Sequence, residues 1–103
     1  MRVETLPSAE KEIRKTARHI QQEFDRKSRD KFIQRVNETK KLLATNPYLG
    51  PVEPLLKERT RTYRSVVVGK LNKMIYHIID DHIEVVALWD CRREPTTLAD
   101  EVK

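Results

Sequence analysis

The sequence predicts an α+β domain in which a helical hairpin packs on a small, mainly antiparallel sheet, in the element order β-α-α-β-β-β. Two observations carry this prediction. Apolar residues recur at helical spacing in the first half of the chain, and short β-rich runs separated by turn residues fill the second half. At 103 residues the chain has room for a single domain, which we expect to span residues 1–103.

The first expected element is a short strand over residues 2–6, where polar and apolar side chains alternate. Pro7 breaks the strand, and Ser8 can cap a helix because its side-chain oxygen accepts from a free backbone N–H of the first turn. Apolar side chains then recur at helical spacing at Ala9, Ile13, Ala17, Ile20 and Phe24. This stripe predicts a first helix with one buried face.

A second helix is expected to follow after a short link, capped by Asp25 or Ser28. Its buried face is formed by Phe32, Val36, Thr39 and Leu43, widened by Ile33 and Leu42. Asn46 ends this helix, because a residue that precedes proline avoids the helical region. Two helices joined by so short a link form an antiparallel hairpin.

The second half of the chain is expected to form three strands after a rigid connector. The connector, residues 47–54, holds three of the five prolines together with Gly50. The β-rich runs cover residues 63–68, 72–79 and 82–89. The sheet would then be completed by the N-terminal strand, with the helices on one face.

The turn between the last two strands decides which side chains share a face. If Asp80 and Asp81 form a two-residue hairpin turn, Ile79 opposes His82, and side chains alternate from there. One face is then apolar and should receive the helices: Met74, Tyr76, Ile78, Ile83, Val85, Ala87 and Trp89. The other is mixed: Lys73, Ile75, His77, Ile79, His82, Glu84, Val86 and Leu88. We place function on the mixed face, because core packing does not require its polar groups.

Composition narrows the class of protein. The net charge is +5 and the pI about 9.5, and the stretch from Lys57 to Lys73 is basic apart from Glu58. Such a stretch fits a polyanionic partner, either nucleic acid or an acidic protein, or an ordinary solvated face.

No apolar run approaches the roughly 20 residues of a membrane span. Cys91 is the only cysteine and no export signal is visible, so we expect a reducing, cytoplasmic location without a membrane.

Three segments of the second half resemble the C-terminal half of RelE/ParE toxins. They are the pair Tyr63-Arg64, the hairpin over residues 72–86 with its Asp80-Asp81 turn, and the end of the last strand, Asp90-Cys91-Arg92-Arg93-Glu94-Pro95. The first half resembles this family in element order and in the Asn46-Pro47 link to Gly50. The resemblance implies a compact ribonuclease-like α+β fold and a cognate antitoxin protein that wraps the toxin. It also implies one of two targets, mRNA on the ribosome or DNA gyrase.

RelE-like enzymes cleave RNA without a metal, using cations that stabilise the charge on the phosphate and a group that moves protons. By the resemblance, the catalytic cations would be Arg64, Lys73 and Arg93. Residues expected to bind nucleic acid or another target are Arg59, Arg61, Lys70 and Arg92. Two positions depart from the pattern, since Val66 stands where a lysine is usual and Ala99 where a tyrosine is usual. His77 or His82 can supply the acid and base, or both can be plain polar residues of an open face.

The predicted function is therefore the growth-arresting toxin of a type II toxin–antitoxin system, with either a metal-independent endoribonuclease activity or non-enzymatic inhibition of gyrase. The departures at Val66 and Ala99 favour the second target or an atypical nuclease. An alternative is a degenerate, non-toxic member that only binds its antitoxin and takes part in autoregulation. An acidic antitoxin segment is expected on the mixed face near Lys73 and Arg93, or along an exposed sheet edge. His77, His82 and Glu84 share that face, but we expect no metal and no cofactor there.

Overall fold

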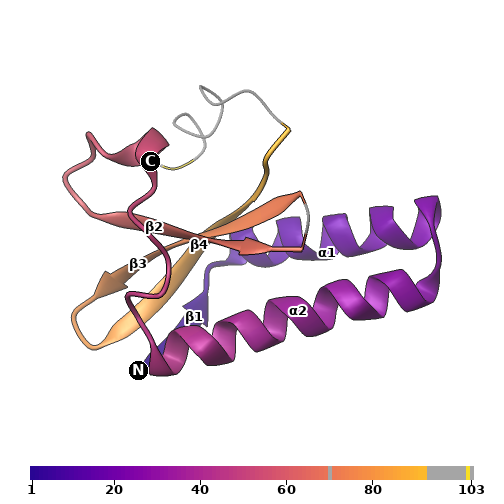
Figure 1. Cartoon of the computed structure of the whole chain (residues 1–103), viewed down its shortest axis with the longest axis horizontal. Coiled ribbons are helices and arrows are strands. Elements are labelled where there is room, and N and C mark those ends of the chain that lie inside the picture. The colour runs from indigo at the N-terminus through magenta and orange to yellow at the C-terminus, as the bar shows by residue number, and fades with distance from the viewer. Residues whose placement is uncertain (70, 93–101, 103) are drawn as a thin grey trace.

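The computed structural model describes residues 1–69, 71–92 and 102, and it has the predicted element order (Figure 1). Its elements are β1 (Arg2–Thr5), α1 (Pro7–Glu23), α2 (Arg26–Thr45), the 3-10 helix η1 (Pro54–Leu56), β2 (Tyr63–Val68), β3 (Asn72–Ile79) and β4 (His82–Asp90). The two helices form an antiparallel hairpin that extends well past the sheet at one end. Within the described residues, neither helix carries the long apolar stretch that crossing a bilayer requires.

The N-terminal caps of the two helices match the sequence-based prediction only in part. Asp25 caps α2, and its carboxylate accepts a hydrogen bond of 2.7 Å from the backbone N–H of Ser28. That hydrogen bond holds the pKa of Asp25 below its ordinary value. The predicted cap at Ser8 is wrong, because α1 already begins at Pro7, whose fixed φ suits the first turn. Phe24 lies just past the end of α1 and is 76% exposed, so it does not extend the buried stripe.

The sheet has the order β1-β4-β3-β2, with β1 parallel to β4 and the other pairs antiparallel. The predicted hairpin register is confirmed, since Ile79 pairs with His82 and His77 pairs with Glu84. Asp80 has a φ of 52°, in the left-handed region that two-residue hairpin turns use. The sheet is therefore mainly antiparallel, as predicted, with its one parallel pair at the β1 edge.

A β-bulge changes which side chains of β4 face the helices. Tyr76 pairs with Val85 but Ile75 pairs with Ala87, which leaves Val86 as an extra residue on β4. An extra residue reverses the alternation beyond it. Leu88 consequently packs in the core under the helices, whereas Ala87 and Trp89 point to the opposite face. The predicted faces are wrong for these three residues for that reason.

The domain has two apolar cores, one on each side of the sheet. The larger one joins the helices to the sheet and contains Ala9, Ala17, Phe32, Val36, Leu43, Val68, Met74, Tyr76, Ile83, Val85 and Leu88. The second lies on the mixed face and contains Leu56, Tyr63, Ile75, Ala87, Trp89 and Val102. Ile75 and Leu88 were expected on an open surface, yet Ile75 is fully buried and Leu88 is 4% exposed. Leu56 of η1 thus covers part of the face that the sequence left open, beside Ile75, whereas Leu88 is buried under the helices.

The connector is fastened to the sheet by the hydroxyl of Tyr76, which donates to the carbonyl of Pro47 at 2.8 Å and accepts from the N–H of Gly50 at 2.9 Å. Burial raises the pKa of Tyr76, which keeps this hydroxyl protonated and able to donate. The backbone of the connector also pairs with β2, through a bridge between Val52 and Arg64. The start of β2 is therefore not a free sheet edge.

Replacing Gly50 by alanine should destabilise the domain by about 2–3 kcal/mol, because an added Cβ would lie 2.3 Å from the backbone oxygen of Ser65. Gly69 offers a matched control. Its φ of 72° also favours glycine, but a Cβ there meets only the end of the Arg35 side chain at 3.6 Å. Gly69→Ala should cost only about 1 kcal/mol. Urea unfolding of both variants measures the difference, and equal losses would contradict the close approach at Gly50.

Candidate functional site

Arg64 lies at the start of the edge strand β2, where its guanidinium is held by two neighbours. It donates to the carbonyl oxygen of Gly50 at 3.0 Å, and its Cζ lies 4.9 Å from the ring centre of Tyr48. Tyr48 is itself 70% exposed. The pair therefore forms a cationic and aromatic surface that a partner can reach.

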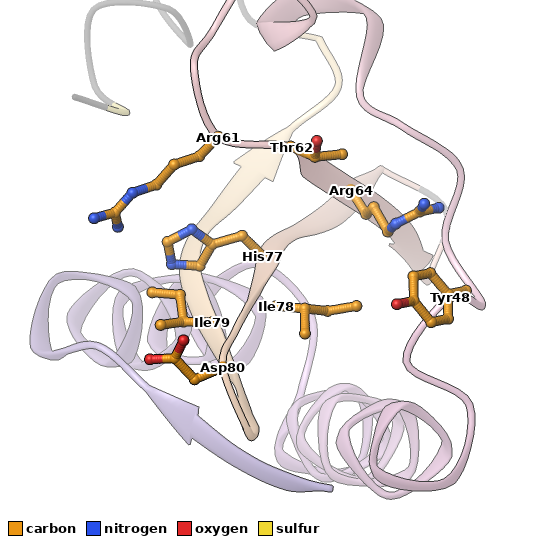
Figure 2. Close-up of a pocket in the computed structure, with 8 residues that line it drawn as sticks. All are labelled: Tyr48, Arg61, Thr62, Arg64, His77, Ile78, Ile79 and Asp80. Atoms are coloured by element: carbon orange, nitrogen blue, oxygen red, sulfur yellow. The ribbon is translucent and has the colours of Figure 1, made fainter.

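Arg64 borders a hollow that opens where β3 continues past the first residue of β2 (Figure 2). Tyr63 pairs with His77, so Ile78 and Ile79 lie beyond the β2 ladder. The hollow is lined by Tyr48, Arg61, Thr62, Arg64, His77, Ile78, Ile79 and Asp80. Of the residues that the sequence put forward, it gathers Arg61, Arg64 and His77.

Lys73 is placed away from this hollow, on the other face of the sheet from Arg64. Arg64 pairs with Tyr76, whose side chain packs in the core under the helices, whereas Lys73 pairs with Trp89, which packs in the second core. The ammonium of Lys73 donates to Oε1 of Glu53 at 2.7 Å, and the Glu53 side chain is 1% exposed. Burial raises the pKa of Glu53, but the hydrogen bonds from Lys73, Ser65 and Leu55 and the charge of Lys73 together outweigh burial, so the pKa lies below its ordinary value.

Of the remaining predicted cations, the structure describes Arg59 and Arg92. Arg92 is exposed and holds both oxygens of Asp90, at 3.1 and 2.7 Å. That pairing with Asp90 raises its pKa. Arg59 is half-buried just beyond η1. Val66 packs against the core under the helices. Lys70, Arg93 and Ala99 lie outside the described residues.

The two histidines of the mixed face differ in their surroundings. His77 is 3% exposed, stacks on the ring of Tyr63 with 5.1 Å between ring centres, and joins Nε2 to Oε1 of Glu84 at 2.8 Å. Its Nδ1 is buried and has no hydrogen-bond partner among the described residues. His82 is more open and lies between Glu4 and Glu84. Only His77 borders the hollow, and both of its ring nitrogens are withdrawn from solvent.

The free energy of unfolding should fall as the pH drops from about 5 to about 3. The hydrogen bond from His77 holds the pKa of Glu84 below 4.5, and Glu53 is shifted the same way. A carboxyl with a lowered folded pKa stabilises above its unfolded pKa and loses that contribution as the pH falls through the folded value. Glu84→Gln should therefore show a shallower acid slope in urea unfolding, while the exposed control Glu23→Gln keeps the slope of the original chain. An unchanged slope in Glu84→Gln would contradict the shift.

Two residues of this region were not singled out from the sequence. Tyr48 follows the first proline of the connector, and a large aromatic there was a visible signal of a surface role. Glu53 lies between two prolines in an otherwise apolar link, and an acidic residue in such a place indicates a fixed cation nearby. Its partner Lys73 is distant in sequence, so the ion pair between Glu53 and Lys73 could not be predicted from the sequence.

Comparison with known proteins agrees with this fold. The sequence profile described as the ParE toxin of the type II toxin–antitoxin system, parDE, matches residues 3–95. No individual curated protein matches the chain. The match covers both helices, three whole strands and all but the first residue of β1, which the structure arranges as a helical hairpin on a four-stranded mixed sheet. The chain belongs to the ParE toxin family of type II toxin–antitoxin systems.

Proposed function

We propose that this toxin arrests growth by binding DNA gyrase, in the cytoplasm and without an enzymatic step, and that a cognate antitoxin neutralises it. One observation carries the choice of target. Arg64 and Lys73 lie on opposite faces of the sheet, and each already has a partner within the chain. Metal-independent RNA cleavage needs cations that converge on one phosphate. The membership of the ParE family supports the same target.

Cleavage of mRNA on the ribosome is the second candidate, because Arg61, Arg64 and the Tyr48 ring surround the hollow of Figure 2. Two cations beside an exposed aromatic ring can hold a nucleotide by charge and stacking. In this candidate the hollow binds RNA, and Arg93 would have to supply the third cation. His77 would act as the acid or base only if its hydrogen bond to Glu84 opened.

Inducing the chain alone in a bacterial host separates these candidates. Growth, protein synthesis and the length of a reporter mRNA are followed in one culture, and purified protein is added to gyrase with relaxed plasmid. We expect filamentous arrest with intact message, and loss of supercoiling in the purified reaction. Message cut within its translated region, with supercoiling unaffected, supports the ribosomal target and refutes ours. Unimpaired growth at full expression would indicate the non-toxic, antitoxin-binding member.

We also propose that an acidic and apolar segment of the antitoxin pairs with the outer edge of β2 at Val66–Val68. The connector occupies the edge only as far as Ser65, whose N–H donates to Pro51. Val67 is 66% exposed and pairs with Lys73 on the next strand, so apolar and basic groups lie side by side. Hydrogen exchange of the complex should show new protection in Val66–Val68. Protection confined to the helical hairpin would overturn this placement.

A further inference from the structure

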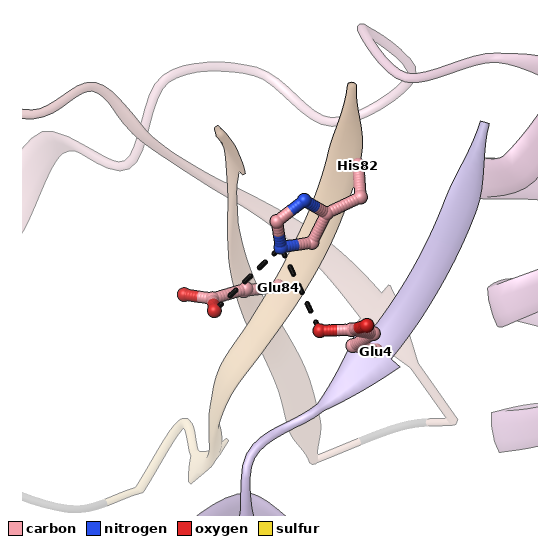
Figure 3. A group of neighbouring side chains, drawn as sticks. All are labelled: Glu4, His82 and Glu84. Carbon is pink, nitrogen blue, oxygen red and sulfur yellow. Dashed lines mark ion pairs between the residues drawn. The ribbon is translucent and has the colours of Figure 1, made fainter. Parts of the chain in front are cut away.

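Glu4, Glu84 and His77 form one cross-strand row on the mixed face. In the parallel pair Glu4 lies opposite Glu84, and in the neighbouring antiparallel pair Glu84 lies opposite His77. Like charges placed directly opposite destabilise a sheet unless a cation lies between them. His82 is two residues before Glu84 on β4 and shares its face, beside both carboxylates (Figure 3).

Each carboxylate has one oxygen held by a neighbour and turns the other toward the same imidazole nitrogen. Oε1 of Glu4 accepts from Arg2 at 3.0 Å, and Oε1 of Glu84 lies 2.8 Å from Nε2 of His77. The second oxygens lie 3.6 Å (Glu4) and 3.7 Å (Glu84) from Nε2 of His82. The ligand atoms of Glu4, His82 and Glu84 all lie within 4.8 Å of one another.

These separations fit ligands that share an ion better than groups that bond directly. A charge-assisted hydrogen bond is about 2.7–2.9 Å long. Two ligands about 2.0–2.1 Å from a tetrahedral zinc ion are about 3.4 Å apart. The 3.6 and 3.7 Å distances lie near the second value. The oxygens of Glu4 and Glu84 lie within 4.8 Å of each other, so these two side chains must move toward one another for all three atoms to coordinate one ion.

The side chains that contact Glu4, His82 and Glu84 hold them as the neighbours of metal ligands commonly do. Arg2 orients Glu4 and His77 orients Glu84. Nδ1 of His82 lies 3.4 Å from a carboxylate oxygen of Asp81, where an Nδ1–H leaves the lone pair on Nε2 facing the two glutamates. Such contacts fix the ring and raise its basicity as a ligand. His77 is buried against Tyr63, so Glu84 is held by a rigid neighbour.

We propose that Glu4, His82 and Glu84 bind one divalent transition-metal ion of the zinc class, which ties β1 to β4. One imidazole and two carboxylates favour zinc over Mg²⁺ or Ca²⁺, which prefer all-oxygen sites. Three protein ligands leave a fourth position for water. The sequence led us to expect no metal, because His77, His82 and Glu84 were scattered ligands on a flat sheet. Glu4, from the opposite end of the chain, was not among them. This site does not depend on the target of the toxin.

Titration of the full chain with Zn²⁺, after removal of any affinity tag, tests the proposal. Cys91 is exposed and is itself a zinc ligand, so the reference protein carries Cys91→Ser. We expect one Zn²⁺ per chain by calorimetry, a rise in melting temperature, and no response to Mg²⁺ at the same concentrations. Co²⁺ should give the visible absorption of a site with nitrogen and oxygen ligands.

Variants assign the binding to these side chains. Glu4→Gln, His82→Asn and Glu84→Gln should each weaken Zn²⁺ binding at least about tenfold, while His19→Asn and Glu23→Gln, exposed on α1, leave it unchanged. His77→Phe keeps the stacked ring but frees Glu84, so a positioning role predicts about tenfold weaker binding and an altered, not absent, Co²⁺ spectrum. No saturable binding by the reference protein, or equal binding by His82→Asn and His19→Asn, would overturn the proposal.

Discussion

Replacing Lys73 by methionine is expected to lower the free energy of unfolding at pH 7 by about 3 kcal/mol, since removing one partner of a buried pair leaves the other charge uncompensated. Glu53 is 1% exposed, and the ammonium of Lys73 contacts its carboxylate at 2.7 Å. Methionine keeps most of the apolar length of lysine, so the loss comes mainly from the charge. Urea unfolding followed by circular dichroism measures it. A loss under about 1 kcal/mol would mean that the pair behaves like an exposed surface ion pair.

The pH dependence of the free energy of unfolding shows whether Lys73→Met loses stability through charge or through packing. In the original chain the pKa of Glu53 is below 4.5, so this group stabilises above that pH and its contribution is lost in acid. Without Lys73, its hydrogen bond and charge no longer lower this pKa, and burial is opposed only by the hydrogen bonds from Ser65 and Leu55. The folded pKa of Glu53 therefore rises, and the variant loses less stability than the original chain as the pH falls. The gap between Lys73→Met and the original chain should therefore narrow from pH 7 to about pH 4. A constant gap would point to lost packing.

The double variant Glu53→Met/Lys73→Met separates stability from function. Replacing both partners by apolar groups of similar size is often close to neutral, so most of the lost stability should return. Lys73 is also a predicted catalytic cation, and a single variant that loses toxicity cannot tell a damaged fold from a missing cation. If the stable double variant arrests growth, Lys73 has a structural role. If it is stable and inactive, Lys73 contributes to target binding or cleavage.

The sequence predicted the elements whose signals are local. The two helices follow from their apolar stripes, and the β3–β4 register follows from the Asp80-Asp81 turn, because a turn fixes the pairing of the residues on either side of it. The features it missed depend on contacts between distant segments. The pairs Glu53–Lys73 and Glu4–His82 join positions that only the β1–β4 pairing and the folded connector bring together.

The bulge at Val86 shows how a local irregularity limits prediction from alternation. The run from Val85 to Trp89 is apolar throughout, so either phase of alternation places apolar residues on both faces. The outcome is decided by packing, with Leu88 filling the core under the helices and Trp89 filling the second core with Leu56 of η1. For the same reason the surroundings of Lys73 could not be predicted, because Lys73 pairs with Trp89 and lies beside that second core.

Trp89→Ala should cost about 4 kcal/mol, because a tryptophan that is 1% exposed leaves a large cavity when truncated. Trp89→Phe should cost less, about 2 kcal/mol, since the ring still fills part of that space. Thermal unfolding followed by circular dichroism measures both. A loss below about 1 kcal/mol for Trp89→Ala would show that the second core adds little to stability.

A double-mutant cycle then determines which face Trp89 occupies. Combined with Leu56→Ala, in the second core, Trp89→Phe should show an interaction energy of about 1 kcal/mol, because both side chains line the same cluster. Combined with Leu43→Ala, in the core under the helices, the two losses should add to within about 0.5 kcal/mol. Coupling to Leu43 in place of Leu56 would place Trp89 under the helices, where uninterrupted alternation puts it. Coupling to Leu56 alone requires the reversal at Val86, since no regular strand carries Val85 and Trp89 to opposite faces.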